Sequence, residues 1–209
     1  MKITRVGDWK DAARILAGGG KRLQAAVDRA VLQEAQFFRT KIVEGIREQA
    51  PGGQPFKPLA PTTLAIRRFR GFKGTKALLV RGDLRNSIVV VRKPDGVFVG
   101  VLRTAKGREG QPLVNVAAVH EFGSRPIVVK LTPKARRFLH AAFRAAKLDQ
   151  PASGGPPTGI AVIKVPARPF LTPVFEKHGA DADAVSRRFL ERVARLLGGT
   201  FGSVKGGSR

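Results

Sequence analysis

One long amphipathic segment, from Lys21 to Gln49, constrains the fold more than any other part of the sequence. Apolar side chains recur within it near the spacing of an α-helix, at Leu23, Val27, Ala30, Val31, Phe37, Phe38, Ile42 and Ile46. Three glycines, 18–20, precede the segment, and the breaker cluster Pro51-Gly52-Gly53 follows it. The sequence therefore predicts one long helix after a flexible glycine hinge, with a short helix from Asp8 to Leu16 on the other side of that hinge.

Strands are predicted in the middle of the chain. Segments 86–93 and 97–102 flank the turn Pro94-Asp95-Gly96, an arrangement typical of a β-hairpin. Three further apolar segments are predicted as strands: 114–119, 127–131 and 160–165.

Further helices are predicted from Pro61 to Phe69, from Pro133 to Lys147 and from Asp181 to Leu197. The 133–147 segment carries apolar residues on one arc and charged ones on the opposite arc. The fold class is therefore α+β, with a long N-terminal helix and a C-terminal helix packed on an antiparallel β meander.

The same pattern predicts one domain with two terminal segments. Residues 1–20 form an N-terminal arm, residues 21–198 a single α+β domain, and residues 199–209 a flexible tail. Within the domain, residues 132–159 are predicted to be a helix-loop insertion, because a Pro/Gly/Ser-rich loop follows the helix there.

The composition excludes several classes of protein. The chain has no cysteine, which excludes disulfide frameworks, thiolate zinc sites and cysteine nucleophiles. It has no apolar run of about 18 residues that could span a bilayer, and no apolar segment follows the charged N-terminus as in a signal peptide. We therefore expect a protein that is not exported and has no membrane partner.

Residues suited to catalysis are few. His120 and Glu121 are adjacent, and in a strand they would point to opposite faces. His140 and His178 have no partner at metal-ligand spacing, and Gly18-Gly19-Gly20-Lys21 lacks the Ser or Thr of a phosphate-binding loop. We expect no enzyme activity and no catalytic, cofactor or metal site, so that a nuclease or other hydrolase is the least supported class.

Positive charge is abundant and unevenly placed. The chain has 39 Lys and Arg against 15 Asp and Glu, a formal charge of +24. Segment 57–108 has 13 basic and two acidic residues, and segment 124–173 has nine and one, whereas the terminal helices mix both signs. This pattern favours a surface that meets a polyanion over ordinary solvation. Contact with DNA would involve phosphates, because the clusters lack aromatic platforms or a groove-reading helix.

Two motifs need more than composition to explain them. Val119-His120-Glu121-Phe122-Gly123 joins an apolar segment, a carboxylate and a glycine. In segment 165–171, Pro166 and Pro169 restrict the backbone around Arg168, while Phe170 and Leu171 anchor the loop. The simpler interpretation of this second motif is a rigid turn with a structural salt bridge.

Six features follow one another along the chain. After the long N-terminal helix come FKPLAPTT at 56–63, LVRGDLRNSI at 79–88, VFVG at 97–100, AAVHEFG at 117–123 and PARPFL at 166–171. This order resembles the tailed-phage virion morphogenesis and tail-completion proteins, with motifs W-x-P-L-S-x-x-T, L-x-x-T-G-x-L-x-x-S-I, Y-A-x-I-H-x-F-G and P-A-R-P-F-L. The resemblance covers residues 21 to 197, and the chain departs from the family at Phe56, Arg81 and Ala117, where Trp, Thr and Tyr are usual.

The resemblance implies a structural virion protein at the head–tail junction that joins or completes the tail and is not an enzyme. It implies a homo-oligomeric ring, hexameric or dodecameric, with connector, tail tube and sheath proteins as partners and double-stranded DNA bound non-specifically in the lumen. Such a protein would assemble in the host bacterial cytoplasm and end in the virion. A tail terminator of the same junction and a non-viral, sequence-independent nucleic-acid-binding protein stay open as alternatives.

Two sets of candidate residues follow. The basic residues expected to face DNA or to dock on a neighbouring ring are Arg67, Arg68, Arg70, Lys73, Lys76, Arg103, Lys106, Arg108, Arg137 and Arg144. The residues expected to fix loop geometry or to make subunit contacts are Glu121, Phe122, Arg168 and Phe170.

Overall fold

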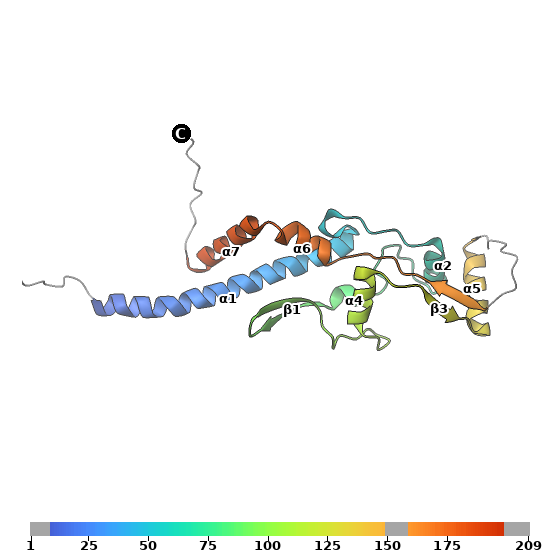
Figure 1. The fold of residues 1–209 in the computed structure, drawn as a ribbon, viewed down its shortest axis with the longest axis horizontal. Helices are drawn as coiled ribbons and strands as arrows, with labels where there is room; N and C mark the ends of the chain where they lie inside the picture. Colours follow the sequence, from blue (N-terminus) through green and yellow to red (C-terminus); the bar gives the residue numbers. More distant parts are fainter. Residues whose placement is uncertain (1–8, 149–158, 199–209) are drawn as a thin grey trace, which may run out of the picture.

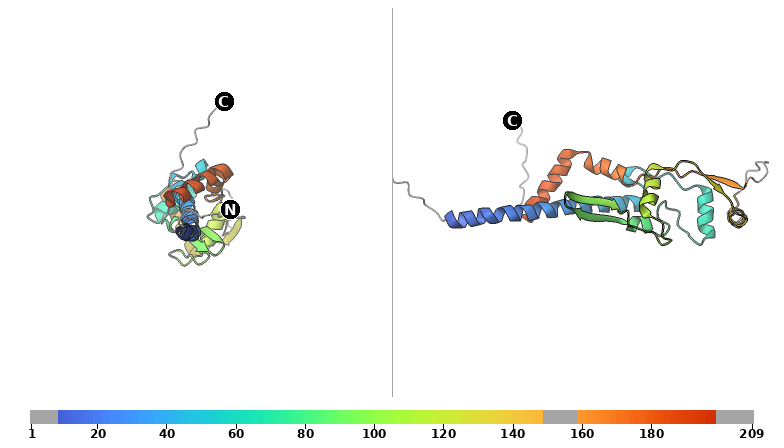
Figure 2. Two further views of the ribbon diagram at one scale, coloured as in Figure 1. Left: turned by 90° about the vertical axis from the view of Figure 1, so that its left-hand side faces the viewer. Right: turned by 60° about the horizontal axis from the view of Figure 1, so that its bottom comes forward.

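The computed structural model describes residues 9–148 and 159–198, and the subunit is elongated along its first helix (Figure 1). That helix, α1 (Trp9–Glu48), has the strands β1 (Ile88–Lys93) and β2 (Gly96–Val101) on one side and the helices α6 (Thr172–Gly179) and α7 (Ala182–Leu196) on the other (Figure 2). Four elements lie at the end away from the start of α1: α2 (Pro61–Phe69), β3 (Ile127–Lys130), α5 (Pro133–Ala145) and β4 (Ile160–Ile163). The predictions for residues 1–8 and 199–209, and for most of the loop 150–159, fall outside the described residues.

Helix α1 confirms the predicted long helix but extends it to 40 residues. The predicted glycine hinge is wrong, because Gly18, Gly19 and Gly20 lie inside the helix, and the predicted separate helix before them is part of α1. A glycine costs only about 1 kcal/mol relative to alanine in a helix interior, and each added residue extends an existing helix by one hydrogen bond. Three glycines therefore weaken the helix without ending it.

The predicted β-hairpin is confirmed. Strands β1 (Ile88–Lys93) and β2 (Gly96–Val101) pair antiparallel from Ile88↔Val101 to Lys93↔Gly96 around a two-residue turn. The short helix α3 (Asp83–Asn86) leads into β1, and both strands pack against α1.

The predicted strand 114–119 is wrong, because these residues belong to helix α4 (Leu113–Phe122). Its buried residues, Leu113, Ala117 and Glu121, recur every four positions, which is a helical spacing. A short apolar run such as this one fits a buried strand or a buried helix equally well by pattern. His120 and Glu121 therefore lie on successive positions of a helix.

Strands β3 (Ile127–Lys130) and β4 (Ile160–Ile163) confirm the other two predicted strands and pair antiparallel. They form a two-stranded sheet separate from β1–β2 within the described part of the chain. The α+β class is thus confirmed, whereas the predicted continuous meander is replaced by two separate ribbons because the segment between them is helical.

Two predicted helices pack together at the ribbon end of the molecule. Helix α2 (Pro61–Phe69) lies against α5 (Pro133–Ala145), which occupies the connection between β3 and β4. The rings of Phe69 and Phe138 meet edge to face with centroids 5.3 Å apart, and the Arg70 guanidinium lies 5.4 Å from the centroid of the Phe138 ring.

The C-terminal part of the chain forms two helices, α6 (Thr172–Gly179) and α7 (Ala182–Leu196). Helix α6 contacts the short 3-10 helix η1 (Pro51–Gly53), which follows α1 in the sequence. The predicted terminal helix is confirmed as α7, with the Asp181 side chain capping its N-terminus. It packs on α1 and not, as predicted, on the strands. Glu34 of α1 holds this pair together, because its carboxylate accepts hydrogen bonds from Arg188 and Arg192.

The main hydrophobic core draws one or two residues from each of α1, α3, β1, β2, α4 and α6, and Phe170 from the loop before α6. It is built from Ile42, Ile46, Leu84, Ile88, Val101, Leu113, Ala117, Phe170 and Val174. A smaller cluster between α1 and α7 contains Ala26, Ala30 and Val193. Residues from 42 to 174 thus meet in a single core next to α4, and this arrangement positions the site described below.

Candidate functional site

The carboxylate of Glu121 joins the two sequence motifs. Glu121 is buried on α4 and accepts backbone N–H hydrogen bonds from Phe170 (2.8 Å), Leu171 (3.1 Å) and Thr172 (2.8 Å). Because α6 begins at Thr172, these are the free amides at the start of that helix, where a negative charge is favourable. Glu121 therefore acts as a helix cap supplied by a distant part of the chain.

Arg168 joins the second motif to the segment before α2. Its side chain is 5% exposed. Nε donates to the carbonyl of Lys57 at 2.8 Å and Nη2 to the carbonyl of Pro58 at 2.9 Å. Its backbone N–H donates to the carbonyl of His120 at 2.7 Å. The salt-bridge interpretation of this arginine is wrong for the described side chains, because its partners are main-chain carbonyls.

Gly123 allows the two motifs to approach each other. Its backbone, at φ 81° and ψ 175°, lies in a region essentially reserved for glycine. A Cβ atom at this position would lie 3.1 Å from the nitrogen of Ala167 and 3.3 Å from the oxygen of Val165. The N–H of Ser124 donates to that same Val165 oxygen at 2.9 Å. The motif 119–123 is thus held next to the motif 165–171 where the first leads into β3 and the second follows β4.

The two phenylalanines of the candidate set have opposite environments. Phe170 is completely buried in the main core, directly beside the amides that Glu121 holds. Phe122 ends α4 with 80% of its surface exposed. Of the two, only Phe122 is available for contact with another protein.

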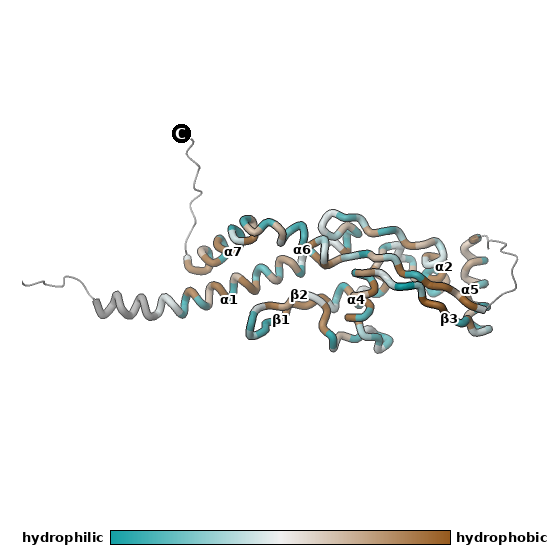
Figure 3. Tube along the Cα trace, viewed as in Figure 1, coloured by the Kyte–Doolittle hydropathy of each residue, from teal (hydrophilic) through white to brown (hydrophobic). Residues whose placement is uncertain are grey.

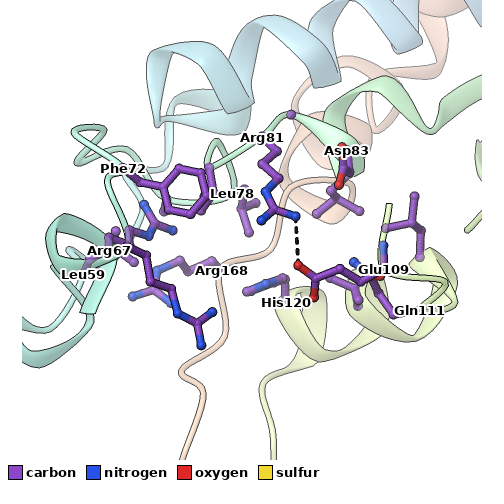
Figure 4. Close-up of a pocket in the computed structure, with 17 residues that line it drawn as sticks. Leu59, Arg67, Phe72, Leu78, Arg81, Asp83, Glu109, Gln111, His120 and Arg168 are labelled. Atoms are coloured by element: carbon purple, nitrogen blue, oxygen red, sulfur yellow. Dashed lines mark hydrogen bonds and ion pairs between the residues drawn. The ribbon is translucent and has the colours of Figure 1, made fainter. Parts of the chain in front are cut away.

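A pocket of about 290 Å³ lies beside these motifs, between α2, α3, α4 and the loop after α2. Figure 4 shows Arg81 and Glu109 joined on one side of the pocket, with Arg67 and Arg168 on the other side and His120 between them. Arg81 donates to the Glu109 carboxylate at 2.8 Å. Arg67 donates instead to the main-chain carbonyls of Gly74 and Lys76.

The positive groups of this pocket perturb one another. Burial lowers the pKa of Arg67, and the charge of Arg168 lowers it further. Burial also lowers the pKa of His120, with further lowering by Arg168 and then Arg67. Nδ1 of His120 is buried and has no hydrogen-bond partner among the described residues. His120 and Arg81 are not among the site residues predicted from the sequence, although a helix over 113–122 would place His120 one turn from Val116.

The other predicted basic residues lie at the surface. All nine are exposed: Arg68, Arg70, Lys73, Lys76, Arg103, Lys106, Arg108, Arg137 and Arg144. Contact between α2 and α5 places Arg68 and Arg70 at the same end of the molecule as Arg137 and Arg144, although 67 residues separate Arg70 from Arg137 in the sequence. Arg108 lies on a different loop and forms an ion pair with Asp83 at 3.3 Å. Arg67 differs from this group because it is half-buried and holds a loop.

Large apolar side chains are exposed at both ends of the subunit. The ribbon patch consists of residues on β3 and β4: Ile127, Val128, Ile160, Val162 and Ile163. The helical patch consists of Leu23 on α1, Leu190 within α7 and Leu197 at the C-terminal end of α7. Leu23 and Leu197 line one hollow between these helices. Figure 3 shows the apolar colouring of the β3 ribbon at the end opposite α7.

Within residues 9–148 and 159–198, no three His, Asp or Glu side chains are grouped so that they could hold a metal ion. None of the helices in this part of the chain combines the length and the apolar character needed to cross a membrane.

Comparison with known proteins gives one match. A family model described as the phage virion morphogenesis family matches residues 21–194. No curated protein and no solved structure matches the chain. The matched residues begin within α1 and end within α7, so they include Glu121, Arg168 and the ribbon patch.

Proposed function

The chain belongs to the phage virion morphogenesis family, and we propose on this basis that it is a structural protein of the head–tail junction. In this proposal several copies form a ring around the DNA channel and join or complete the tail. Its neighbours are the connector on one side and tail tube or sheath proteins on the other. Family membership supports a role in building the virion, and the surface of the subunit supports self-association.

The observation that carries self-association is the exposure of the ribbon patch. Val128 and Val162 are directly paired across β3 and β4 and are both 66% exposed. A two-stranded ribbon is at best marginally stable by itself in water, and β-branched residues with free strand edges favour pairing with another chain. The described residues of its own chain leave this ribbon uncovered, so in this proposal a neighbouring subunit buries it.

We assign the second copy of this chain as the occupant of the ribbon patch because the subunit carries a second apolar patch at its other end. Contact between the ribbon patch of one copy and the helical patch of the next uses two different surfaces. Such head-to-tail contacts form a ring when the rotation between neighbours closes. The β3–β4 ribbon and the contact between α1 and α7 lie far apart along the elongated chain (Figure 1), so the two patches can serve two different neighbours, as a ring requires.

The test is the oligomeric state of the full chain, measured by light scattering after size exclusion and by negative-stain imaging. We expect rings for the wild type and monomers for Val128→Asp and Val162→Asp, because an unpaired carboxylate cannot be buried in an apolar contact. Arg92→Asp, at an exposed position on the other ribbon, is the matched control and should still form rings. A monomeric wild type, or rings formed equally well by Val128→Asp, contradicts the proposal.

Basic side chains near α2 and α5 are proposed to face the DNA in the lumen. Four exposed arginines lie on α2, at its C-cap or on α5, which contacts α2: Arg68, Arg70, Arg137 and Arg144. Charge at this position in every copy of a ring gives a positive, sequence-independent surface of the kind that phosphates bind. Arg67 is left out of this surface because its guanidinium holds the carbonyls of Gly74 and Lys76.

Salt dependence of binding to a DNA duplex tests this surface. The double variant Arg68→Glu and Arg70→Glu should reduce the slope of log K against log salt by about 2, close to one unit for each lost phosphate contact. Arg187→Glu with Arg195→Glu on α7 applies the same charge change to exposed residues at the other end. If the two double variants have equal slopes of log K against log salt, net charge alone governs DNA binding and this surface has no special part in it.

A monomeric nucleic-acid-binding protein is the alternative from another class. It predicts that the isolated chain binds duplex DNA tightly without forming rings, and that Val128→Asp leaves binding unchanged. The same light-scattering experiment, repeated with and without DNA, separates the two.

A further inference from the structure

We propose that the pocket between α2, α4 and Arg168 is a binding site for a carboxylate carried on an apolar stem, such as a glutamate side chain of a partner protein. Neither the family nor the proposed ring assigns a ligand to this pocket. Three features of the pocket support this proposal: the hydrogen-bond partners of its charged groups, the apolar side chains in its walls and the low exposure of Arg168.

The charges in the pocket are incompletely paired. Four arginines and two carboxylates line it: Arg67, Arg70, Arg81, Arg168, Asp83 and Glu109. Glu109 is paired with Arg81 at 2.8 Å and Asp83 with Arg108 at 3.3 Å. Among the described residues, Arg67 and Arg168 donate only to main-chain carbonyls, which carry no charge. Two neighbouring guanidinium groups therefore lack a negative partner.

His120 supplies a further unmet hydrogen-bonding group. Its Nδ1 atom is buried and has no partner among the described residues, although most buried side-chain polar atoms in proteins are hydrogen-bonded. Figure 4 shows His120 between the Arg81–Glu109 pair and the two other arginines. An anion beside Arg67 and Arg168 would compensate their charges and place an acceptor close to an imidazole N–H.

The walls and entrance of the pocket select the kind of anion. Apolar side chains form much of the lining, including Phe72, Leu78, Leu84 and Val116. Arg168 is 5% exposed, so a phosphate on the backbone of a rigid duplex cannot approach it closely. A volume of about 290 Å³ admits a slender side chain, and arginine forks bind carboxylates well. A carboxylate on a short methylene stem satisfies both the charged and the apolar surfaces.

Butyrate, which matches a glutamate side chain from Cα outward, is the probe, and butyramide is its uncharged counterpart. We expect butyrate to raise the Tm of the full chain relative to chloride at equal ionic strength, because a ligand that binds only the folded state stabilises it. Hydrogen exchange should slow in residues 67–82 and 113–120, and butyramide should have neither effect.

Three variants locate the effect. Arg67→Leu should weaken the apparent affinity for butyrate about tenfold or more, as expected for loss of one charge-assisted pair. Val116→Phe should abolish the effect by filling the pocket, and it keeps the proposal testable if Arg67→Leu fails to fold. Arg187→Leu on α7 removes the same charge at an exposed position and should leave the butyrate effect unchanged.

Several results would overturn the proposal. Equal stabilisation by butyrate and chloride would exclude a specific site, and an unchanged effect in Val116→Phe would place binding elsewhere. Stronger stabilisation by inorganic phosphate would show that the apolar walls play no part. Loss of the butyrate effect on adding a DNA duplex would assign the pocket to the DNA surface. None of these measurements depends on ring formation, because each is made at one fixed protein concentration with the chain in its own oligomeric state.

Discussion

Replacing Glu121 should destabilise the subunit strongly, because one carboxylate holds three amides. The variants are Glu121→Ala, which removes both oxygens, and Glu121→Gln, which keeps the shape and one acceptor oxygen. The Phe170 amide is inside the core, and the Leu171 and Thr172 amides start α6. The effect therefore combines lost hydrogen bonds with a lost helix cap.

The magnitude follows from these three contacts. Leaving the buried Phe170 amide without an acceptor costs about 1–3 kcal/mol. The two partly buried amides add about 1 kcal/mol each, and loss of a negative charge at a helix N-terminus adds about 0.3–1 kcal/mol. We expect Glu121→Ala to lower the free energy of unfolding by about 3–6 kcal/mol. Glu121→Gln should lower the free energy of unfolding by about 2 kcal/mol, because the NH₂ group that replaces one oxygen cannot accept a hydrogen bond from a backbone N–H.

Urea unfolding followed by circular dichroism at 222 nm measures the total effect, at one protein concentration so that oligomerisation contributes equally. Hydrogen exchange of residues 170–172 measures the local one. Glu44→Ala is the control, because Glu44 is an exposed partner of Lys41 and should cost below about 1 kcal/mol. A cost below about 1 kcal/mol for Glu121→Ala, with unchanged exchange at 170–172, would refute the assignment of Glu121 as the cap.

Two other predictions concern protonation and helix propensity. Burial and the charges of Arg168 and Arg67 lower the pKa of His120 in the folded chain. On acidification, His120 therefore takes up a proton at a higher pH in the unfolded chain than in the folded one. Stability should therefore fall as the pH drops below the ordinary histidine value of 6.5. His120→Gln should reduce this loss of stability in urea titrations at several pH values, and a loss as large as that of the wild type would refute the contribution of His120. Replacing Gly18, Gly19 and Gly20 by alanine should raise the helix content and stabilise α1 by up to about 1 kcal/mol at each site, because nothing lies within 4 Å of the added Cβ atoms. Circular dichroism checks this, and a loss of helix would contradict a continuous α1.

The sequence was sufficient for elements whose pattern is local. The 3.6-residue period from Leu23 to Ile46 predicted most of α1, and the turn at Pro94-Asp95-Gly96 predicted the β1–β2 hairpin. Segment 114–119 was assigned wrongly because a short apolar run has no decisive period. The glycine hinge was wrong because helix propensity weighs little against an extended hydrogen-bonded helix.

The candidate site was only partly predictable. Both motifs were found, but a sequence does not show that Glu121 meets backbone amides or that Arg168 meets carbonyls, because neither partner is a side chain. The pocket combines residues from α2, α3, α4 and four loops. Its location depends on how these segments pack, and no short-range pattern encodes that packing.

The hydrogen bonds that Arg168 makes to distant parts of the sequence also determine when the chain can fold during synthesis. Its guanidinium binds carbonyls 110 and 111 residues earlier, and Glu34 of α1 is bonded to Arg188 and Arg192, 154 and 158 residues later. Closing such long loops is entropically costly and slow. The core, which needs both Ile42 and Phe170, cannot be completed until most of the chain has left the ribosome. If copies of this chain associate as proposed, we therefore expect assembly to begin with released, full-length chains.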